Sequence, residues 1–205
     1  MTAFPENFED RLGRHHVAEA QDPPARRAAV AVVFRGAGMD RELLLMRRIE
    51  VPGDPWSGHI SLPGGMRMAT DATLLQVAVR EAHEEVGLDL AHSARLLCRM
   101  ESFRAVAGRK IPPMDITPFV FRMEAEVTAT PGREAEECFW LPLKEVLGGQ
   151  LDTEHRLVRN GVRQTLPAWR YGGRVVWGMT YRMICDVLQA GGVSTQLPKT
   201  ARSGP

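Results

Sequence analysis

The chain has few cysteines and almost no net charge. Its 205 residues include three cysteines, and 26 basic residues are balanced by 25 acidic ones, for a formal net charge of +1. Cys98, Cys138 and Cys185 lie far apart and form no Cys-x-x-Cys pair, which argues against a disulfide framework and indicates free thiols in a reducing cytoplasm. The balanced charge offers no broad field to hold nucleic acid, so an anionic ligand must be met locally.

The sequence also lacks a long apolar run and any internal repeat. No run approaches the roughly 18 residues that a membrane span needs, so no membrane partner is expected. Arg26 and Arg27 precede a short apolar stretch in the manner of a twin-arginine signal, but no small-residue cleavage site follows before Arg35. We therefore interpret residues 28–34 as a first strand of a globular domain.

The pattern along the chain predicts one domain with two flanking segments. Residues 1–26 form an N-terminal extension with a polar helix over 4–20, residues 27–190 form the domain, and the polar tail 191–205 is predicted to be disordered. Within the domain, a strand at 42–47 pairs with the first one, and a Gly- and Pro-rich loop runs over 52–65. Further strands are predicted at 95–100, 116–123 and 138–141, a short helix at 144–147, and a strand followed by a helix over 174–188.

A helix beginning at Asp71 or Thr73 and ending at Val86 carries the most informative pattern. Thr73-Leu-Leu-Gln76 has the spacing of a capping box, and Gly87 is a suitable C-terminal glycine. At about 100° per residue one side of this helix is acidic and a separate stripe is apolar. The acidic side comprises Glu81, Glu84 and Glu85, and the apolar stripe comprises Leu75, Val79, Ala82 and Val86.

The clustered carboxylates allow two interpretations. On an exposed helix such pairs cost only about 0.2–0.5 kcal/mol, so a solvated acidic face is one of them. In a shielded cleft each pair would repel by roughly 3 kcal/mol, so that protons or a cation would be required. Hard oxygen ligands suit Mg²⁺ or Mn²⁺. Gly64 and Gly65, just before the helix, favour the metal interpretation because glycine lets the backbone approach a ligand closely.

These residues resemble the signature of the Nudix hydrolases: Gly, five residues, Glu, seven residues, Arg-Glu-apolar-x-Glu-Glu-x-Gly-apolar. The second half reads Arg80-Glu-Ala-His-Glu-Glu-Val-Gly-Leu88. The first half has Asp71 in place of Glu and one extra residue, which is similar to the coenzyme A diphosphatase branch. Two further segments, 58–65 and 176–180, resemble the upstream signature and the Trp-Gly-x-Thr-Ala element of that branch.

The resemblance implies an α/β fold, a Nudix-type α/β/α sandwich with a mixed β-sheet. It implies that Mg²⁺ or Mn²⁺ is bound by the carbonyl of Gly64 and by Glu81, Glu84 and Glu85, with Glu85 also counted as catalytic. Arg80 is four residues from Glu84 and is expected to hold that carboxylate in place. The general base comes from another loop; Glu134 is our choice, and the neighbouring Glu136 and Glu137 are the alternatives. The cations expected to bind substrate are Arg47, Arg104, Arg109 and Lys110.

The sequence gives no firm role to its large aromatic residues and histidines. Trp56 and Trp177 are candidates for stacking on an adenine ring, with core or lid packing as the alternative. His59 and His83 have no recognisable partner in the sequence and receive no role.

The function implied by the resemblance is hydrolysis of a diphosphate linkage in a small nucleotide substrate. Coenzyme A or a thioester of it is the first choice, giving 3′,5′-ADP and a 4′-phosphopantetheine product. ADP-ribose, NADH or a nucleoside triphosphate is the second. A regulatory domain that binds nucleotide without cleaving it is the third. The family is also compatible with a homodimer, and the expected location is cytoplasmic.

Overall fold

The computed structural model describes residues 4–15, 17, 26–54, 56–105, 113–159 and 161–193. The strands are β1 (Arg27–Arg35), β2 (Glu42–Arg48), β3 (Ile60–Ser61), β4 (Gly64–Met66), β5 (Ala94–Arg99), β6 (Phe103–Ala105), β7 (Met114–Met123), β8 (Ala135–Pro142), β9 (Asp152–Arg159), β10 (Val162–Tyr171) and β11 (Arg174–Trp177). The helices are α1 (Phe8–Gly13), α2 (Leu74–Val86), α3 (Leu90–Ser93), α4 (Leu143–Leu147) and α5 (Gly178–Ala190), with a 3₁₀ turn, η1, at Gly38–Asp40. None of the helices in these ranges is long and apolar enough to cross a bilayer.

The described strands form a mixed main sheet and a smaller antiparallel one. The main sheet has the order β3-β2-β1-β7-β5, with β4 on β1, β6 on β7 and β8 on β2. Its central pair, β1 with β7, is parallel, while β1 with β2 and β5 with β7 are antiparallel. The mixed sheet expected from the sequence is therefore confirmed.

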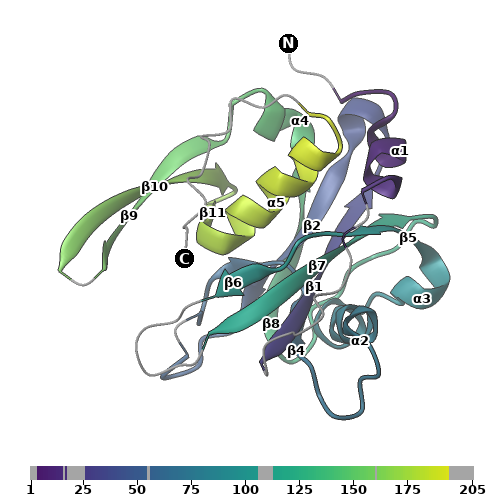
Figure 1. The fold of residues 1–205 in the computed structure, drawn as a ribbon. Helices are drawn as coiled ribbons and strands as arrows, with labels where there is room; N and C mark the ends of the chain where they lie inside the picture. Colours follow the sequence, from purple (N-terminus) through teal and green to yellow (C-terminus); the bar gives the residue numbers. More distant parts are fainter. Residues whose placement is uncertain are drawn as a thin grey trace.

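Strand β1 is buried on both faces, which makes the sheet the middle layer of a sandwich. Ala31 and Val33 belong to the core beneath α2, whereas Val32 and Phe34 belong to the core shared with α1 and α5. Figure 1 shows α2 on one side of the main sheet and α1 and α5 on the other. Successive residues of a strand point to opposite faces, so the continuous apolar run of β1 suits a strand that is covered on both sides.

Helix α2 forms as its sequence predicts. The Thr73 hydroxyl oxygen accepts a hydrogen bond from the Gln76 backbone N–H, and the Gln76 side-chain oxygen accepts one from the Thr73 backbone N–H, so the capping box is complete. Gly87 ends the helix in the left-handed conformation (φ 69°), which glycine adopts without a Cβ penalty. Both ends of α2 are thus set locally, and this determines which helical turns carry the acidic residues.

The N-terminal helix is shorter than the predicted 4–20 and packs into the main core. Phe8 and Leu12 are buried in the cluster that also contains residues of α5. On its other side, Glu9 accepts hydrogen bonds from Arg41 and Arg95 at 2.9 Å and from Arg122 at 3.2 Å. One carboxylate therefore joins α1 to two arginines of the main sheet and to Arg41, which directly precedes β2.

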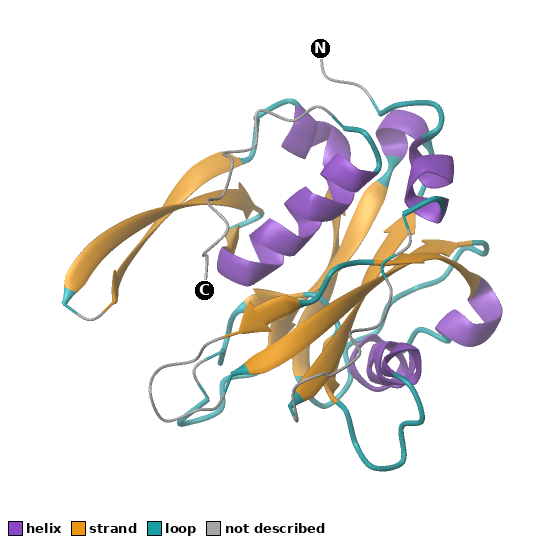
Figure 2. Cartoon of the chain, viewed as in Figure 1, coloured by secondary structure: helices purple, strands orange, loops and turns teal. Residues whose placement is uncertain are grey.

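A two-stranded arm made by β9 and β10 projects from the body (Figure 2). The sequence analysis assigned no strand to it. Its outer part is exposed, since Val158 and Val162 are 66% and 59% accessible, while Trp169 at its base is fully buried. The predicted disordered tail lies outside the described residues beyond Val193, and Val193 itself is buried.

Candidate active site

The last turns of α2 face the backbone of β4, and Glu85 is the buried member of the acidic set. Only 2% of the surface of Glu85 is exposed to solvent. The N–H of Gly64 donates to its Oε2 at 2.7 Å. Burial raises the pKa of Glu85 to about 8, with the nearby charge of Glu81 adding to the effect and the Gly64 hydrogen bond opposing it. A carboxylate in this position is costly to ionise unless a cation compensates the charge.

Glu81 lies beside the second glycine of the pair. A Cβ placed on Gly65 would stand 2.3 Å from Glu81 Oε1, so any larger residue would displace this carboxylate. Burial raises the pKa of Glu81, while Arg80 lowers it. Two adjacent carboxylates thus share a site in which both are harder to ionise, as the sequence analysis expected for a shielded cleft.

Arg80 connects the acidic set to the loop before the helix. Its guanidinium lies 2.9 Å from Glu81 and 3.0 Å from Glu84, which confirms the expected contact with Glu84. It also forms two hydrogen bonds of 3.1 Å to Asp71 and donates to the carbonyl of Met66 at 3.3 Å. The hydrogen bond from Arg80 holds the pKa of Asp71 below its ordinary value. Asp71, which the sequence marked as a possible helix start and as a departure from the family pattern, is thus the buried anchor of Arg80.

Replacing Arg80 by alanine is expected to lower kcat/KM by about 10- to 100-fold, the usual cost of losing a group that orients metal ligands. The loss should be only partly restored in Arg80→Lys, because lysine cannot reproduce the planar fork that binds Asp71 at two points. Steady-state kinetics at saturating metal checks this. An Arg80→Ala enzyme with unchanged kcat/KM would show that the orientation of Glu81 and Glu84 does not depend on this arginine.

The acidic residues fit a divalent cation by chemistry. Within the described ranges, no three Asp, Glu, His or Cys side chains converge tightly enough to surround an ion as they stand. The guanidinium of Arg80 occupies the space between Glu81 and Glu84, and the latter is about half exposed. The donors are nevertheless hard oxygens. Burial disfavours the ionised forms of Glu81 and Glu85, and a divalent cation would stabilise both negative charges. Gly64 is adjacent, although its N–H rather than its carbonyl is the group seen to contact Glu85.

Arg48 also belongs to this site and was missed in the sequence. Its guanidinium is 3.7 Å from Glu85 Oε1 and 3.4 Å from Asp54 Oδ2. Arg48 follows Met46 on the face of β2 that belongs to the core beneath α2, whereas Arg47 lies on the opposite face. Alternation within the strand separates the two arginines, but only the fold decides which face of the sheet α2 covers.

The three candidate bases separate clearly. The charge of Glu134 raises the pKa of both Glu81 and Glu85, so it lies close enough to act on them, and it is exposed. Glu137 instead accepts hydrogen bonds from Arg47 at 2.9 Å and from Arg174 at 3.0 Å, and these hold its pKa below the ordinary value. Glu136 is exposed.

The predicted substrate cations are placed differently from one another. Arg47 is paired with Glu137, and Arg104 with Asp115 at 2.8 Å. To contact a phosphate, each guanidinium group would have to bind it while keeping its carboxylate partner, or leave that partner. Arg109 and Lys110 lie outside the described residues.

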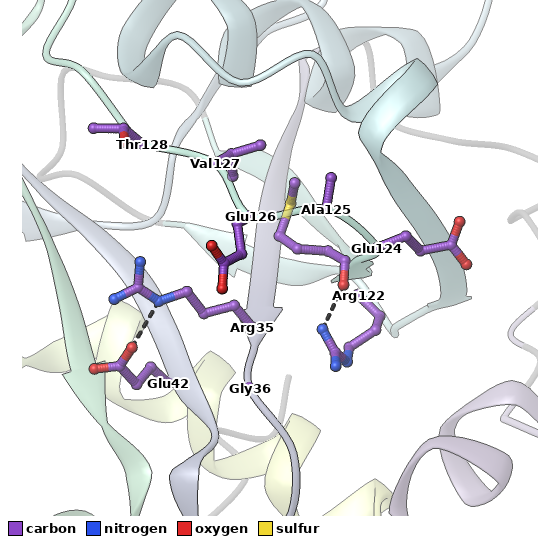
Figure 3. A pocket seen from close by; sticks show the side chains of 10 residues that line it. Arg35, Gly36, Glu42, Arg122, Glu124, Ala125, Glu126, Val127 and Thr128 are labelled. Carbon is purple, nitrogen blue, oxygen red and sulfur yellow. Dashed lines mark hydrogen bonds and ion pairs between the residues drawn. The ribbon is translucent and has the colours of Figure 1, made fainter.

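A concavity of about 690 Å³ lies at the other end of β1 (Figure 3). Arg35, Glu42 and Arg122 line it together with the segment 123–128, and Arg35 pairs with Glu42 at 2.6 Å. Gly64 pairs with Val30, five residues before Arg35 on the same strand. The concavity is therefore separate from the acidic turns of α2.

The chain is similar in sequence to a known family of proteins. The NUDIX domain model matches residues 24–163. The human mitochondrial coenzyme A diphosphatase NUDT8 is 28% identical over 195 residues, covering 93% of this chain and 80% of the relative. The peroxisomal coenzyme A diphosphatase ndx-8 of Caenorhabditis elegans is 31% identical over 131 residues, 62% of this chain and 52% of the relative, so the chain spans about half of that protein.

Solved structures support the fold. A bifunctional NMN adenylyltransferase/ADP ribose pyrophosphatase from Francisella tularensis, complexed with AMP and a Mn ion, aligns with a TM-score of 0.52 at 20% identity. The alignment covers 84% of this chain and 44% of that one. At this identity the likeness concerns the fold alone.

Proposed function

The chain belongs to the Nudix family and is a pyrophosphohydrolase, and from this premise we propose that it hydrolyses the diphosphate of coenzyme A or of its thioesters. Water would attack one phosphorus of the diphosphate and the bond to the bridging oxygen would break. The products would be 3′,5′-ADP and 4′-phosphopantetheine or its acylated form. Two relatives named as coenzyme A diphosphatases, at 28% and 31% identity, support this substrate, as does Asp71 with the extra residue that follows it in the motif.

The observation that carries the proposal is the buried carboxylate at the end of α2. Glu85 lies 2% exposed beside Glu81, with a pKa raised to about 8. A side chain with no catalytic task would be replaced at little cost by an apolar residue at such a position. Glu81, Glu84, Glu85 and the backbone at Gly64 are the groups that would hold Mg²⁺ or Mn²⁺. Such an ion, when bound, neutralises diphosphate oxygens and lowers the pKa of water.

The other residues would orient groups and move protons. Arg80, anchored on Asp71, would hold Glu81 and Glu84 in place. Glu134 would accept the proton of the attacking water, since it is exposed and its charge acts on both inner carboxylates. Arg47, Arg104, Arg109 and Lys110 remain our candidates for contacts to the additional phosphates of the substrate.

A panel of substrates tests the proposal. The purified chain would be incubated with coenzyme A, acetyl-coenzyme A, ADP-ribose, NADH and nucleoside triphosphates, with Mg²⁺ or Mn²⁺ in turn, and the products followed by mass spectrometry. We expect kcat/KM to be highest for a coenzyme A compound, with 3′,5′-ADP released. A higher kcat/KM for ADP-ribose, NADH or a triphosphate would reject coenzyme A as the substrate but leave diphosphate hydrolysis as the reaction. Nucleotide binding without turnover of any compound would favour a regulatory domain.

Glu134→Gln is expected to lower kcat by about 10²-fold, at the lower end of what a general base contributes. The rise of kcat/KM with pH that reflects ionisation of the base should also disappear. Glu136→Gln, the alternative candidate, should keep that rise. If the dependence on pH is retained in the Glu134 variant and lost in the Glu136 variant, the base has been assigned to the wrong residue.

The setting of the reaction is also a proposal. Cys98, Cys138 and Cys185 are free thiols, which suits a reducing compartment such as the cytoplasm. The two relatives are named as mitochondrial and peroxisomal proteins, and fractionation with an antibody would decide the location here. A homodimer remains a prediction that sedimentation would test.

A further inference from the structure

Three aromatic side chains from separate parts of the chain stack on one another where β11 meets the loop before β3. The ring of His155, on the arm strand β9, lies parallel to that of Trp177 at the end of β11, with centroids 3.9 Å apart and an interplanar angle of 20°. His59, in the loop before β3, meets the same indole edge-on at 5.1 Å and 64°. The three residues are more than 20 positions apart in sequence, so only the fold brings them together.

The stack is connected to the carboxylates by short links. The carbonyl of His59 accepts a hydrogen bond from the Arg48 N–H at 3.0 Å, and the guanidinium of Arg48 lies 3.7 Å from Glu85. On the other side, the hydroxyl of Thr180 donates to the carbonyl of Ile60 at 3.1 Å and ties the start of α5 to β3. Arg48 therefore lies next to both His59 and Glu85 and links the stack to the carboxylates.

The chemistry of the stack suits a flat, uncharged ligand group. All three side chains are partly exposed rather than fully buried. Burial lowers the pKa of both His59 and His155, which favours neutral imidazoles at neutral pH. Neutral heteroaromatic faces attract the π-face of a nucleobase, and such stacking tolerates any base.

Anchoring of the arm does not require the stack. Trp169 at the base of β10 is fully buried and packs on Tyr181 with ring centroids 4.3 Å apart. Tyr171, two residues further on, stacks on Phe139 at 6.2 Å. These contacts already hold β10 against the body, which leaves the exposed ring surface of His155 and Trp177 without a structural purpose.

We propose that His59, Trp177 and His155 form a stacking surface for the base of the nucleotide substrate, with the β9–β10 arm supplying one wall of the subsite. The inference rests on the proposed function in that it takes the substrate to be a nucleoside diphosphate derivative. It assigns to His155, a residue of the arm, a direct contact with substrate and makes the arm part of the nucleotide-binding site.

Equilibrium binding separates stacking from phosphate recognition. Isothermal titration calorimetry would compare AMP with ribose 5-phosphate, which lacks the base, on the full chain in Mg²⁺. Base stacking contributes about 1–3 kcal/mol per base, so AMP is expected to bind about 5- to 150-fold more tightly. His155→Ala and Trp177→Leu should bring the two dissociation constants to within about threefold.

Two further variants keep the test sharp. His155→Phe retains a flat ring and should restore the preference for AMP, whereas Tyr171→Leu alters the other contact of the arm and should leave it unchanged. A wild-type chain that binds AMP no better than ribose 5-phosphate would overturn the inference, and so would an unchanged preference in both His155→Ala and Trp177→Leu. Failure of His155→Phe to restore the preference would also overturn it, because a flat ring at this position would then not be what binds the base.

The outcome is independent of the coenzyme A assay. Preference for AMP that depends on His155, in a chain that does not cleave coenzyme A, would support the base subsite and reject the proposed substrate. Cleavage of coenzyme A without that preference would do the reverse.

Discussion

Replacement of Glu85 by glutamine is expected to lower kcat by about 10³-fold while leaving the fold intact. The buried carboxylate would supply charge to a bound cation at the diphosphate, and loss of one preorganised electrostatic group at a reaction centre costs about 10²–10³-fold. Steady-state kinetics with the preferred substrate of the panel, at several metal concentrations, measures the change.

The stability of Glu85→Gln relative to the wild type is expected to depend on pH. Glu85 has its pKa raised to about 8 in the folded chain, above the ordinary 4.5, so the folded state binds the extra proton between these values. Stability of the metal-free wild type therefore falls as pH rises from about 4.5 to about 8, since the unfolded chain ionises freely and the folded one does not. Glutamine resembles the protonated side chain and can still accept from the Gly64 N–H. In EDTA, the unfolding temperature of Glu85→Gln should rise relative to that of the wild type as the pH is raised from 5 to 8.

Glu145→Gln provides the matched control. Glu145 lies on α4, outside the acidic cluster, and its replacement should change neither kcat nor this pH dependence. A fully active Glu85→Gln enzyme would defeat the assignment of this carboxylate to the reaction. A variant that unfolds more readily than the wild type at pH 8 would contradict the raised pKa.

Replacement of Glu9 by alanine is expected to destabilise the chain by about 3 kcal/mol, as breaking a buried ion pair does. Glu9 holds Arg41, whose side chain is only 7% exposed and lies over the ring of Phe8 at 4.7 Å. Without the carboxylate, this guanidinium stays buried with its charge uncompensated, and Arg95 and Arg122 lose the same partner. Urea unfolding at pH 7 measures the change in the free energy of unfolding.

Asp10→Ala serves as the control because Asp10 is the exposed neighbour of Glu9 on α1. It should shift the unfolding midpoint little, within the ±0.5 kcal/mol typical of surface substitutions. If the two alanine variants were equally stable, the arginine cluster would not depend on Glu9.

Local signals in the sequence predicted the element that carries the chemistry. The capping box at Thr73 and the glycine at Gly87 gave both ends of α2 to within a residue or so. Such signals work because capping involves groups only a few positions apart. The pairing of Arg80 with Glu84 was predictable for the same reason, since positions four apart are neighbours on a helix.

The elements that were missed are those whose stability comes from distant partners. The arm has a turn signal at residues 160 and 161, but its strands carry few apolar residues because most of the ribbon is exposed. The leading helix was predicted too long and polar, although Phe4, Phe8 and Leu12 repeat every four residues and are all buried. That stripe is recognisable as a core face only once a sheet is present to receive it.

The sequence by itself determined where α2 begins and ends, and that three glutamates share one side of it, because these depend on neighbours within a turn of helix. Only the tertiary structure decided that Glu85 is buried beside Gly64, that Arg48 rather than Arg47 reaches it, and that His155 meets Trp177. Burial, the choice of the sheet face that α2 covers and a stack between distant segments each depend on surfaces that meet after the chain has folded.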